Sequence, residues 1–375
     1  MERIIVKSIL CGDGKRKKCP SPQNKKQRFM DLNESQLRQA AVDYMVEMGS
    51  IRWTSEQTFD YSFNSKLLVY EAGKTFLGMV YNNGQSGLEA FLSVLDSDHV
   101  YRLNDTGWDT APGNSCATSI RHVWQLVSPD VEFNYSIDMM PVGSGKGMVS
   151  VGKIRWDLYD GKNTTESILK HTPTEDVLQS YAEAEPGDAM MRYLDKGGHA
   201  LLVTKPAKVK RNPDGTIDPD GSFMYLTDQN NLLNTVREYP SSWKIDRETT
   251  FTKALDCGWL PVSIAAFRAE KVPMPEVVMY GAPTAEALKA GIGLSGELRS
   301  NYCMTSVGIE IRKGKRIVSR QEVYPYARSI LLSKVRNLPD TKNLKAGSYE
   351  LRLRVKAGLY CFETSPVTFE IGSAS

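Results

Sequence analysis

The sequence predicts an α+β domain followed by a small all-β sandwich domain. Its 375 residues, 41% of them apolar, exceed what one ordinary hydrophobic core organises, so at least two units are expected. Helical periodicity dominates the first half of the chain and strand patterns follow it, with little alternation between the two. Alternating apolar residues then continue to the end. We therefore expect a mobile basic arm over 1–30, an α+β domain over 31–275 and a β-sandwich over 285–375.

The balance of charge indicates neither a nucleic-acid nor a membrane partner. The formal net charge is only +3, and charged residues of both signs are interspersed. The KRKK run at 15–18 is interpreted as a solvated segment of the arm. No apolar stretch approaches the ~18 residues that span a bilayer. An apolar run before the basic residues reverses the order of a secretory signal, so no signal peptide is visible.

Two helix starts are visible in the first part of the chain. Asn33 is a suitable N-cap and is followed three residues later by Gln36, which predicts a helix there. Further along, Gly and Pro interrupt regular structure in the loop TGWDTAPGNS at 106–115. Apolar residues then recur on one helical face: Cys116, Ile120, Val123 and Val127. A helix is therefore expected to begin at the cysteine.

Only one cysteine lies where its surroundings would activate it. The six cysteines, at 11, 19, 116, 257, 303 and 361, form no CxxC pair and no dense disulfide spacing. We therefore expect no metal site and no cofactor. At the first turn of a helix, the macrodipole and free N–H groups lower the pKa of Cys116 below the ~8.5 of a free thiol. The same N–H groups are suited to holding an oxyanion.

A thiolate nucleophile needs a partner that takes up and returns a proton, and imidazole is best matched to neutral pH. His99 and His171 lie in polar, loop-like sequence. His122 follows Cys116 by six residues, which turns it by about 240° around the helix. His199 opens an apolar strand behind a Gly-Gly pair, where another backbone can approach closely. His199 is therefore the predicted general base.

Four short motifs together resemble a known family. They are GMVYNNG at 78–84, GNSCATSIRHVW at 113–124, PGDAMMR at 186–192 and GGHALLV at 197–203. In this order they resemble the NlpC/P60 family of cysteine peptidases and amidases, over roughly residues 70 to 260. The resemblance implies a papain-like, NlpC/P60-type catalytic domain, to which an Ig-like β-sandwich is appended. Ser115 departs from the family, which usually has an acidic residue directly before the cysteine.

The resemblance also assigns roles to individual residues. It implies Cys116 as nucleophile, His199 as base and Tyr81 beside the nucleophile. The residue that orients the imidazole is expected on the next strand, where Asp228 and Gln229 are both candidates. Because neighbouring strand residues face opposite sides, at most one of them can act. The candidate substrate-contacting residues are Tyr81, Trp108 and Ser115.

The expected activity is cleavage of an amide bond by Cys–His acyl transfer. The resemblance implies a peptidoglycan peptide or a related short peptide as substrate, and an extracellular or cell-envelope location. A cell-surface ligand is the expected partner of the C-terminal β domain. Two alternatives stay open: an amidase or acyltransferase that acts on a lipid or another small amide, and a non-catalytic binding protein on a degenerate papain-like fold.

Overall fold

The computed structural model describes most of the chain in two compact units. The described residues are 4–5, 7–10, 30–62, 67–102, 106–142, 147–158, 164–194, 197–236, 238–290, 294–335, 341 and 343–372. One unit is Asp31–Val272, and the other joins Met1–Met30 with Pro273–Ser375. Each unit has its own sheets and its own buried side chains.

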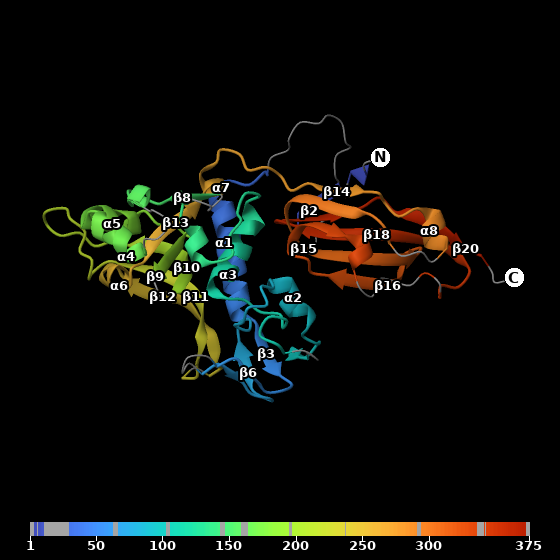
Figure 1. The fold of residues 1–375 in the computed structure, drawn as a ribbon, viewed down its shortest axis with the longest axis horizontal. Coiled ribbons are helices and arrows are strands. Elements are labelled where there is room, and N and C mark those ends of the chain that lie inside the picture. The colour runs from blue at the N-terminus through green and yellow to red at the C-terminus, as the bar shows by residue number, and fades with distance from the viewer. Residues whose placement is uncertain are drawn as a thin grey trace. The chain divides into compact units, whose positions relative to one another are not determined.

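The Asp31–Val272 unit is built on a six-stranded antiparallel sheet (Figure 1). In spatial order its strands are β12 (Ser241–Thr250), β11 (Phe223–Asn234), β10 (Gly197–Lys208), β9 (Ala189–Leu194), β13 (Leu260–Ile264) and β8 (Met148–Ser150). Ala200 to Val203 on β10 are fully buried, which is typical of a strand covered on both faces. Between β10 and β11 the chain reverses through Gly215, whose φ is +89°, a conformation that favours glycine.

Helices cover this sheet and fill the rest of the unit. They are α1 (Glu34–Ser50), α2 (Leu88–Ser93), α3 (Cys116–Val127), α4 (Thr165–His171), α5 (Thr174–Ala182), α6 (Phe251–Asp256) and α7 (Ala265–Arg268), with short 3-10 turns η1 (Ser136–Met139) and η2 (Trp156–Leu158). The cap predicted at Asn33 is confirmed: it forms a capping box with Gln36. Helices α1 and α3 pack on each other and on β10 (Figure 1). Among the described helices, none is long and apolar enough to cross a membrane.

Five short strands form two small sheets around an aromatic cluster. They are β3 (Arg52–Ser55), β4 (Phe59–Asp60), β5 (Val69–Tyr70), β6 (Thr75–Leu77) and β7 (Val100–Tyr101). Trp53 is almost fully buried at the centre, with its ring centroid 5.1 Å from Phe76 and 5.0 Å from Tyr101. Buried aromatic side chains with large contact areas hold such short strands together.

The second unit is a nine-stranded antiparallel assembly. Its strands are β1 (Ile4–Ile5), β2 (Lys7–Leu10), β14 (Val277–Tyr280), β15 (Glu297–Lys313), β16 (Arg316–Val323), β17 (Ala327–Leu331), β18 (Gly347–Ala357), β19 (Tyr360–Glu363) and β20 (Val367–Ile371), with α8 (Ala285–Lys289) and the 3-10 turn η3 (Leu332–Lys334) between strands. On β18 the buried residues alternate from Tyr349 to Val355, so one face of this strand forms core.

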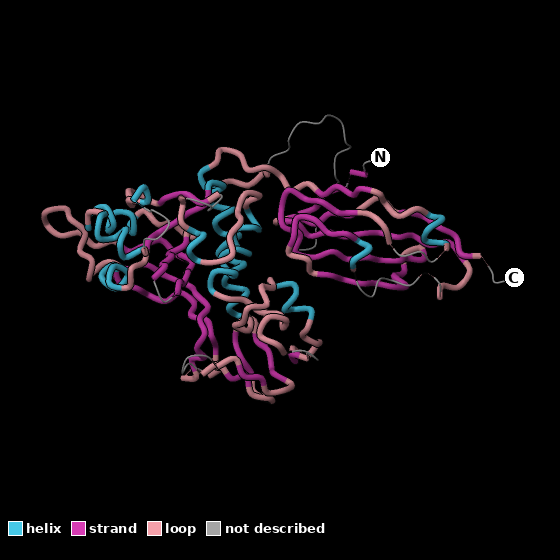
Figure 2. Tube along the Cα trace, viewed as in Figure 1, coloured by secondary structure: helices cyan, strands magenta, loops and turns pink. Residues whose placement is uncertain are grey.

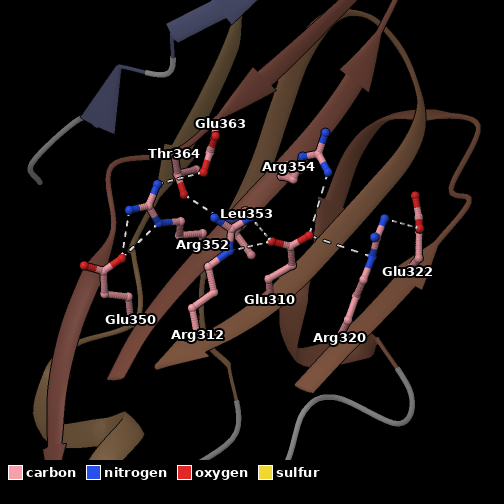
Figure 3. Close-up of polar contacts among 10 residues, drawn as sticks. All are labelled: Glu310, Arg312, Arg320, Glu322, Glu350, Arg352, Leu353, Arg354, Glu363 and Thr364. Carbon is pink, nitrogen blue, oxygen red and sulfur yellow. Dashed lines mark hydrogen bonds and ion pairs between the residues drawn. The ribbon is translucent and has the colours of Figure 1, made fainter. Parts of the chain in front are cut away.

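Charged side chains form a ladder on β15, β16, β18 and β19 of this unit (Figure 3). Glu310 is fully buried, and Arg312 Nε donates a hydrogen bond of 2.9 Å to its carboxylate. Its other oxygen lies 3.8 Å from Arg320 and 3.8 Å from Arg354. The ladder continues through Glu322, Glu350, Arg352 and Glu363. Cross-strand pairs of opposite charge stabilise the register of the strands that carry them.

The expected fold class, a papain-like α+β domain followed by a β-sandwich, is wrong. The chain is predominantly β: strands hold 39% of the described residues and helices 24%, and the strands form several separate sheets (Figure 2). Part of the difference lies between residues 52 and 101, where five strands have two to four residues each. Runs that short display no measurable periodicity, so their aromatic and β-branched residues do not reveal them in the sequence.

The N-terminal residues also differ from the expected arm over 1–30. Ile4–Ile5 pair with β14, and Lys7–Leu10 pair with β19. Strand pairing uses backbone groups, so the basic residues that follow in the sequence do not prevent it. Residues 11–29, with the KRKK run, lie outside the described residues.

Candidate active site

Cys116 is the first residue of α3, as its spacing predicts. The Ser115 side chain caps the helix by accepting a hydrogen bond from Thr118 N–H. Just before the cap, Asn114 pairs with Tyr81 in a parallel bridge. Gly113 is required there, because a Cβ would lie 2.6 Å from the carbonyl oxygen of Val80. This packing places Tyr81 beside the cysteine.

His199 lies near the start of β10, directly opposite Arg192 on β9. The chain enters this strand through Gly197, whose φ is +122°. Gly198 follows, and any side chain there would overlap the Ser136 hydroxyl group on η1. The Gly-Gly pair thus lets η1 pack against the strand at the point where it presents the imidazole.

Asp228 on β11 is the partner of the imidazole. Its Oδ2 lies 2.9 Å from His199 Nε2, and its side chain is only 2% exposed. Arg247 Nη2 lies 3.5 Å from the other carboxylate oxygen, and Asn230 Nδ2 donates a bond of 3.4 Å to Oδ2. Gln229 does not join this group, because its Nε2 donates instead to Met79 O at 2.8 Å.

The structure also brings Cys116 and His199 together. Both side chains line the same cavity, and the charge and hydrogen bond of each contribute to the pKa shift of the other. Since Nε2 of the ring is taken by Asp228, Nδ1 is the nitrogen left for the thiol. Cys116, His199 and Asp228 therefore form a continuous chain from α3 through β10 to β11.

Cys116, His199 and Asp228 shift one another's pKa values. Burial disfavours a thiolate, but the His199 cation, the imidazole hydrogen bond and the N–H groups of Ala200 and Ala117 together hold the pKa of Cys116 below its ordinary value. Burial likewise disfavours an imidazolium, but the Cys116 thiolate and Asp228 raise the pKa of His199 to about 9. Although Asp228 is also buried, its hydrogen bond with His199 lowers its pKa. Both shifts act in the same direction, toward the thiolate–imidazolium form of the pair.

The three substrate-contact candidates occupy different environments. Tyr81 is close to Cys116, and burial followed by the neighbouring thiolate raises the pKa of its phenol. Trp108 packs against Tyr61 and Tyr81, with ring centroids 5.3 and 6.0 Å away, and is 39% exposed. Ser115 acts as the cap of α3. Of these three, Tyr81 lines the cavity described next.

A cavity of about 800 Å³ opens beside the chain of three groups. Cys116, His199 and Asp228 all line it, together with Tyr81 and Trp259. Strands β11 and β12 and helix α6 contribute further lining residues: Asn230, Asn231, Leu232, Lys244, Arg247, Glu248, Thr249, Thr250 and Lys253. A volume of this size fits a small ligand or a short segment of a larger one.

Arg192 and Trp259 also lie in the site, although no motif in the sequence indicates them. The Trp259 ring centroid lies 5.6 Å from that of His199, and the guanidinium carbon of Arg192 lies 4.8 Å from the Trp259 centroid. Directly opposed residues of an antiparallel pair project from the same face, so Arg192 accompanies His199. The available signal was the spacing of four residues between PGDAMMR and GGHALLV, which is short enough for the two segments to pair as neighbouring strands.

The remaining histidines have other partners. A ring nitrogen of His99 lies 3.0 Å from Arg52 O, and one of His171 lies 2.8 Å from Ser167 O. His122 is buried near Gln85 O, and burial lowers its pKa to about 3. Over the described parts of the chain, no group of three or more His, Cys, Asp and Glu side chains is arranged to hold a metal ion.

Comparisons with known proteins find little similarity to this chain. No family model matches this chain, and no curated protein matches it. A solved structure of a DUF3823 family protein from Bacteroides ovatus ATCC 8483 is similar in part, covering 51% of this chain and 90% of that chain. The identity is 12% and the TM-score is 0.17.

The expected membership in the NlpC/P60 family is therefore wrong. No family model supports it, and the chain is predominantly β, with its strands in several separate sheets. The motifs that suggested it contain glycines at turns: φ is +79° at Gly78, +93° at Gly187 and +122° at Gly197. Such short patterns arise wherever a chain needs a left-handed turn, so they do not establish ancestry.

Proposed function

We propose that this protein is a cysteine hydrolase that cleaves an amide bond through an acyl-thioester intermediate on Cys116. One observation carries the proposal: Cys116, His199 and Asp228, from three separate elements, meet as a hydrogen-bonded chain at the wall of a cavity. A nucleophile, a base and a group that orients the base are the parts that covalent acyl transfer requires.

In the first step, the Cys116 thiolate attacks the carbonyl carbon of the amide. The Sγ–C bond forms and the electrons of the carbonyl π bond move to oxygen. When the tetrahedral intermediate collapses, the C–N bond breaks and the His199 imidazolium gives its proton to the leaving amine. The products of this step are a free amine and an acyl-thioester.

In the second step, water attacks the thioester carbonyl. Neutral His199 removes a proton from the water, and the C–S bond breaks to release a carboxylic acid and the thiolate. The imidazolium formed in this way restores the starting ion pair. Asp228 keeps the ring oriented and stabilises its charged form in both steps.

Backbone groups are available for the negative oxygen of the intermediate. The N–H of Ala117, in the first turn of α3, and the N–H of Ala200, on β10, both donate toward the Cys116 sulfur. A carbonyl carbon bonded to that sulfur would bring its oxygen near the same donors. Rigid N–H donors in a site with little water stabilise an oxyanion strongly.

The lining of the cavity bears on the rival enzymatic function. An amidase or acyltransferase for lipids would need a mainly apolar groove for the chain. Here Arg192, Lys244, Arg247 and Lys253 all line the cavity, which favours a polar amide. A short peptide, including a peptidoglycan peptide, is therefore preferred as the substrate over a lipid amide.

Thiol labelling tests the nucleophile directly. Wild-type protein is treated with iodoacetamide at pH 6 to 9, and the labelled cysteines are identified by peptide mass spectrometry. Cys116 should react faster than Cys257, which also lines the cavity. Equal and slow labelling of both would reject a catalytic thiolate and favour the non-catalytic binding protein.

A second experiment tests cleavage. Short peptides and purified peptidoglycan are incubated with wild-type protein, Cys116→Ala and His199→Ala, and the products are compared by mass spectrometry. New amine ends should form with wild type alone. If all three proteins give the same products from every substrate, the hydrolase proposal fails.

A further inference from the structure

We propose that the cavity beside Cys116 binds a carboxylate of the substrate through a group of cations, Arg192, Lys244, Arg247 and Lys253. This inference rests on the proposed hydrolase function and deepens it. The preferred substrates would be amides that carry a negative charge near the scissile bond. We call these four residues the cationic wall.

The strand register places cations on both sides of the reacting groups. Arg192 on β9 lies directly opposite His199 on β10. Lys244 on β12 lies directly opposite Asp228 on β11. Because directly opposed residues of an antiparallel pair share a face, both cations project from the face that carries His199 and Asp228. Across strands β9 to β12, His199 and Asp228 therefore lie between two cations, Arg192 and Lys244.

Two cations have environments that hold them in the cavity wall. Arg192 stacks on Trp259, and its guanidinium also donates a bond of 3.4 Å to Cys257 O. Arg247 is 3.5 Å from Asp228, while its Nε is buried and has no hydrogen-bond partner. A buried donor without a partner is costly, so a bound carboxylate oxygen would relieve a real deficit.

The two carboxylates of the cavity, Asp228 and Glu248, compensate only part of the charge of the four cations. Asp228 is engaged by His199 and Arg247. Glu248 supplies the second negative charge of the lining. Over the described residues, no carboxylate lies within ion-pair distance of Arg192, Lys244 or Lys253. The cavity therefore has an excess of positive charge that attracts an anion.

Two alkylating agents of nearly equal size test the cationic wall. Iodoacetate carries a carboxylate where iodoacetamide carries a neutral amide. In both reactions the Cys116 sulfur bonds to the CH₂ carbon and the C–I bond breaks, which leaves a carboxymethyl or a carbamidomethyl group on sulfur and releases iodide. The measured quantity is the ratio of their rate constants at Cys116, at low salt. Removing one cation about 6 Å from the anion should lower this ratio roughly threefold. In ~1 M salt the preference should disappear, because the Debye length falls to about 3 Å.

The variants are Lys244→Gln, Lys253→Gln and the double variant. Neither lysine stacks on another side chain or forms an ion pair in the described structure, so both changes should leave the fold intact. The matched control is Lys153→Gln, which removes an exposed lysine of the same unit that does not line the cavity. We expect a lower ratio in each cavity variant, a fall of roughly tenfold in the double variant, and no change in the control. Equal ratios in wild type and all four variants would overturn the proposal.

A binding measurement keeps the anion site separate from the chemistry. Cys116→Ala protein, which lacks the thiol, is titrated by calorimetry with glutarate and with glutaramide. Glutarate should bind at least about fivefold more tightly than glutaramide, and Lys244→Gln with Lys253→Gln should remove the difference. Equal binding of the two compounds overturns the cationic wall. If glutarate is preferred while iodoacetamide fails to label wild-type Cys116, the hydrolase proposal fails and the anion site stands.

Discussion

The Nε2 atom of His199 lies 2.9 Å from Oδ2 of Asp228, between two neighbouring strands, and the carboxylate is almost completely buried. A buried carboxylate in this position sets the orientation of the ring and stabilises its positive charge. It also leaves Nδ1 to face the thiol. The contact acts together with the Cys116 thiolate to raise the pKa of His199.

Asp228→Asn should therefore shift the titration of the imidazole. The hydrogen bond and charge of Asp228 help to raise the pKa of His199 to about 9, so their loss should lower that pKa. The chain has only four histidines, and NMR of labelled histidine can follow each one. On any amide that wild type hydrolyses, kcat/KM should fall by roughly 10²- to 10⁴-fold, and its alkaline limb should move to lower pH. An unmoved His199 titration would contradict the role of Asp228.

His199→Ala should make the thiol harder to ionise. The imidazolium lowers the pKa of Cys116 against the effect of burial, so without it the pKa should rise above the ordinary value. The rate of iodoacetamide labelling, measured against pH, should then have its midpoint at higher pH than in wild type. Cys257 serves as the internal reference because its labelling should not change. A midpoint that stays in place would show that another group activates Cys116.

Gln229→Leu separates the two candidates for the third role. Gln229 is buried and donates to Met79 O, which also accepts a bond from Trp243 Nε1. Because Met79 O keeps one donor, the free energy of unfolding should fall by only about 1 kcal/mol in denaturant titration. The His199 titration should match wild type. A large shift of the His199 titration would mean that Gln229 also helps to orient the imidazole and to set its pKa.

Gly198→Ala should disturb the site from outside the reacting groups. The added methyl group would overlap the Ser136 hydroxyl group and lie 3.0 Å from the carbonyl oxygen of Arg192, so the start of β10 must move. His199 follows directly, and labelling of Cys116 at neutral pH should slow. Combining the change with Ser136→Gly should restore part of the rate. No recovery would place the strain at the Arg192 carbonyl instead.

Arg312→Ala tests the charged ladder of the second unit. Arg312 hydrogen-bonds the fully buried Glu310, whereas Arg320 lies 3.8 Å from that carboxylate and is more exposed. Arg312→Ala should lower the free energy of unfolding by roughly 1–3 kcal/mol, because it leaves a buried charge with weaker partners. Arg320→Ala should cost about 0.5 kcal/mol. Thermal and denaturant unfolding measure both, and equal effects would contradict this ranking.

Structural features could be predicted from the sequence where all the interacting residues lie within a few positions of one another. The cap at Asn33 needs only Gln36, and the start of α3 needs only a Pro/Gly-rich loop followed by apolar residues at helical spacing. The fold class was not recoverable in the same way. Strands of two to four residues around Trp53 are held by contacts between distant aromatic rings, and no local period reports such contacts.

By itself the sequence determined that Cys116 begins a helix and that His199 lies near the start of an apolar strand, because capping and periodicity act over a few neighbouring residues. It also determined that only one of Asp228 and Gln229 could face the imidazole, because adjacent strand residues point to opposite sides. Tertiary structure alone decided that Asp228 is the one, and that Arg192 and Trp259 stack beside the ring. The physical reason is strand register. Which residues of two neighbouring strands lie opposite one another depends on the turns and on how whole elements pack, and the sequence of a single strand does not specify it.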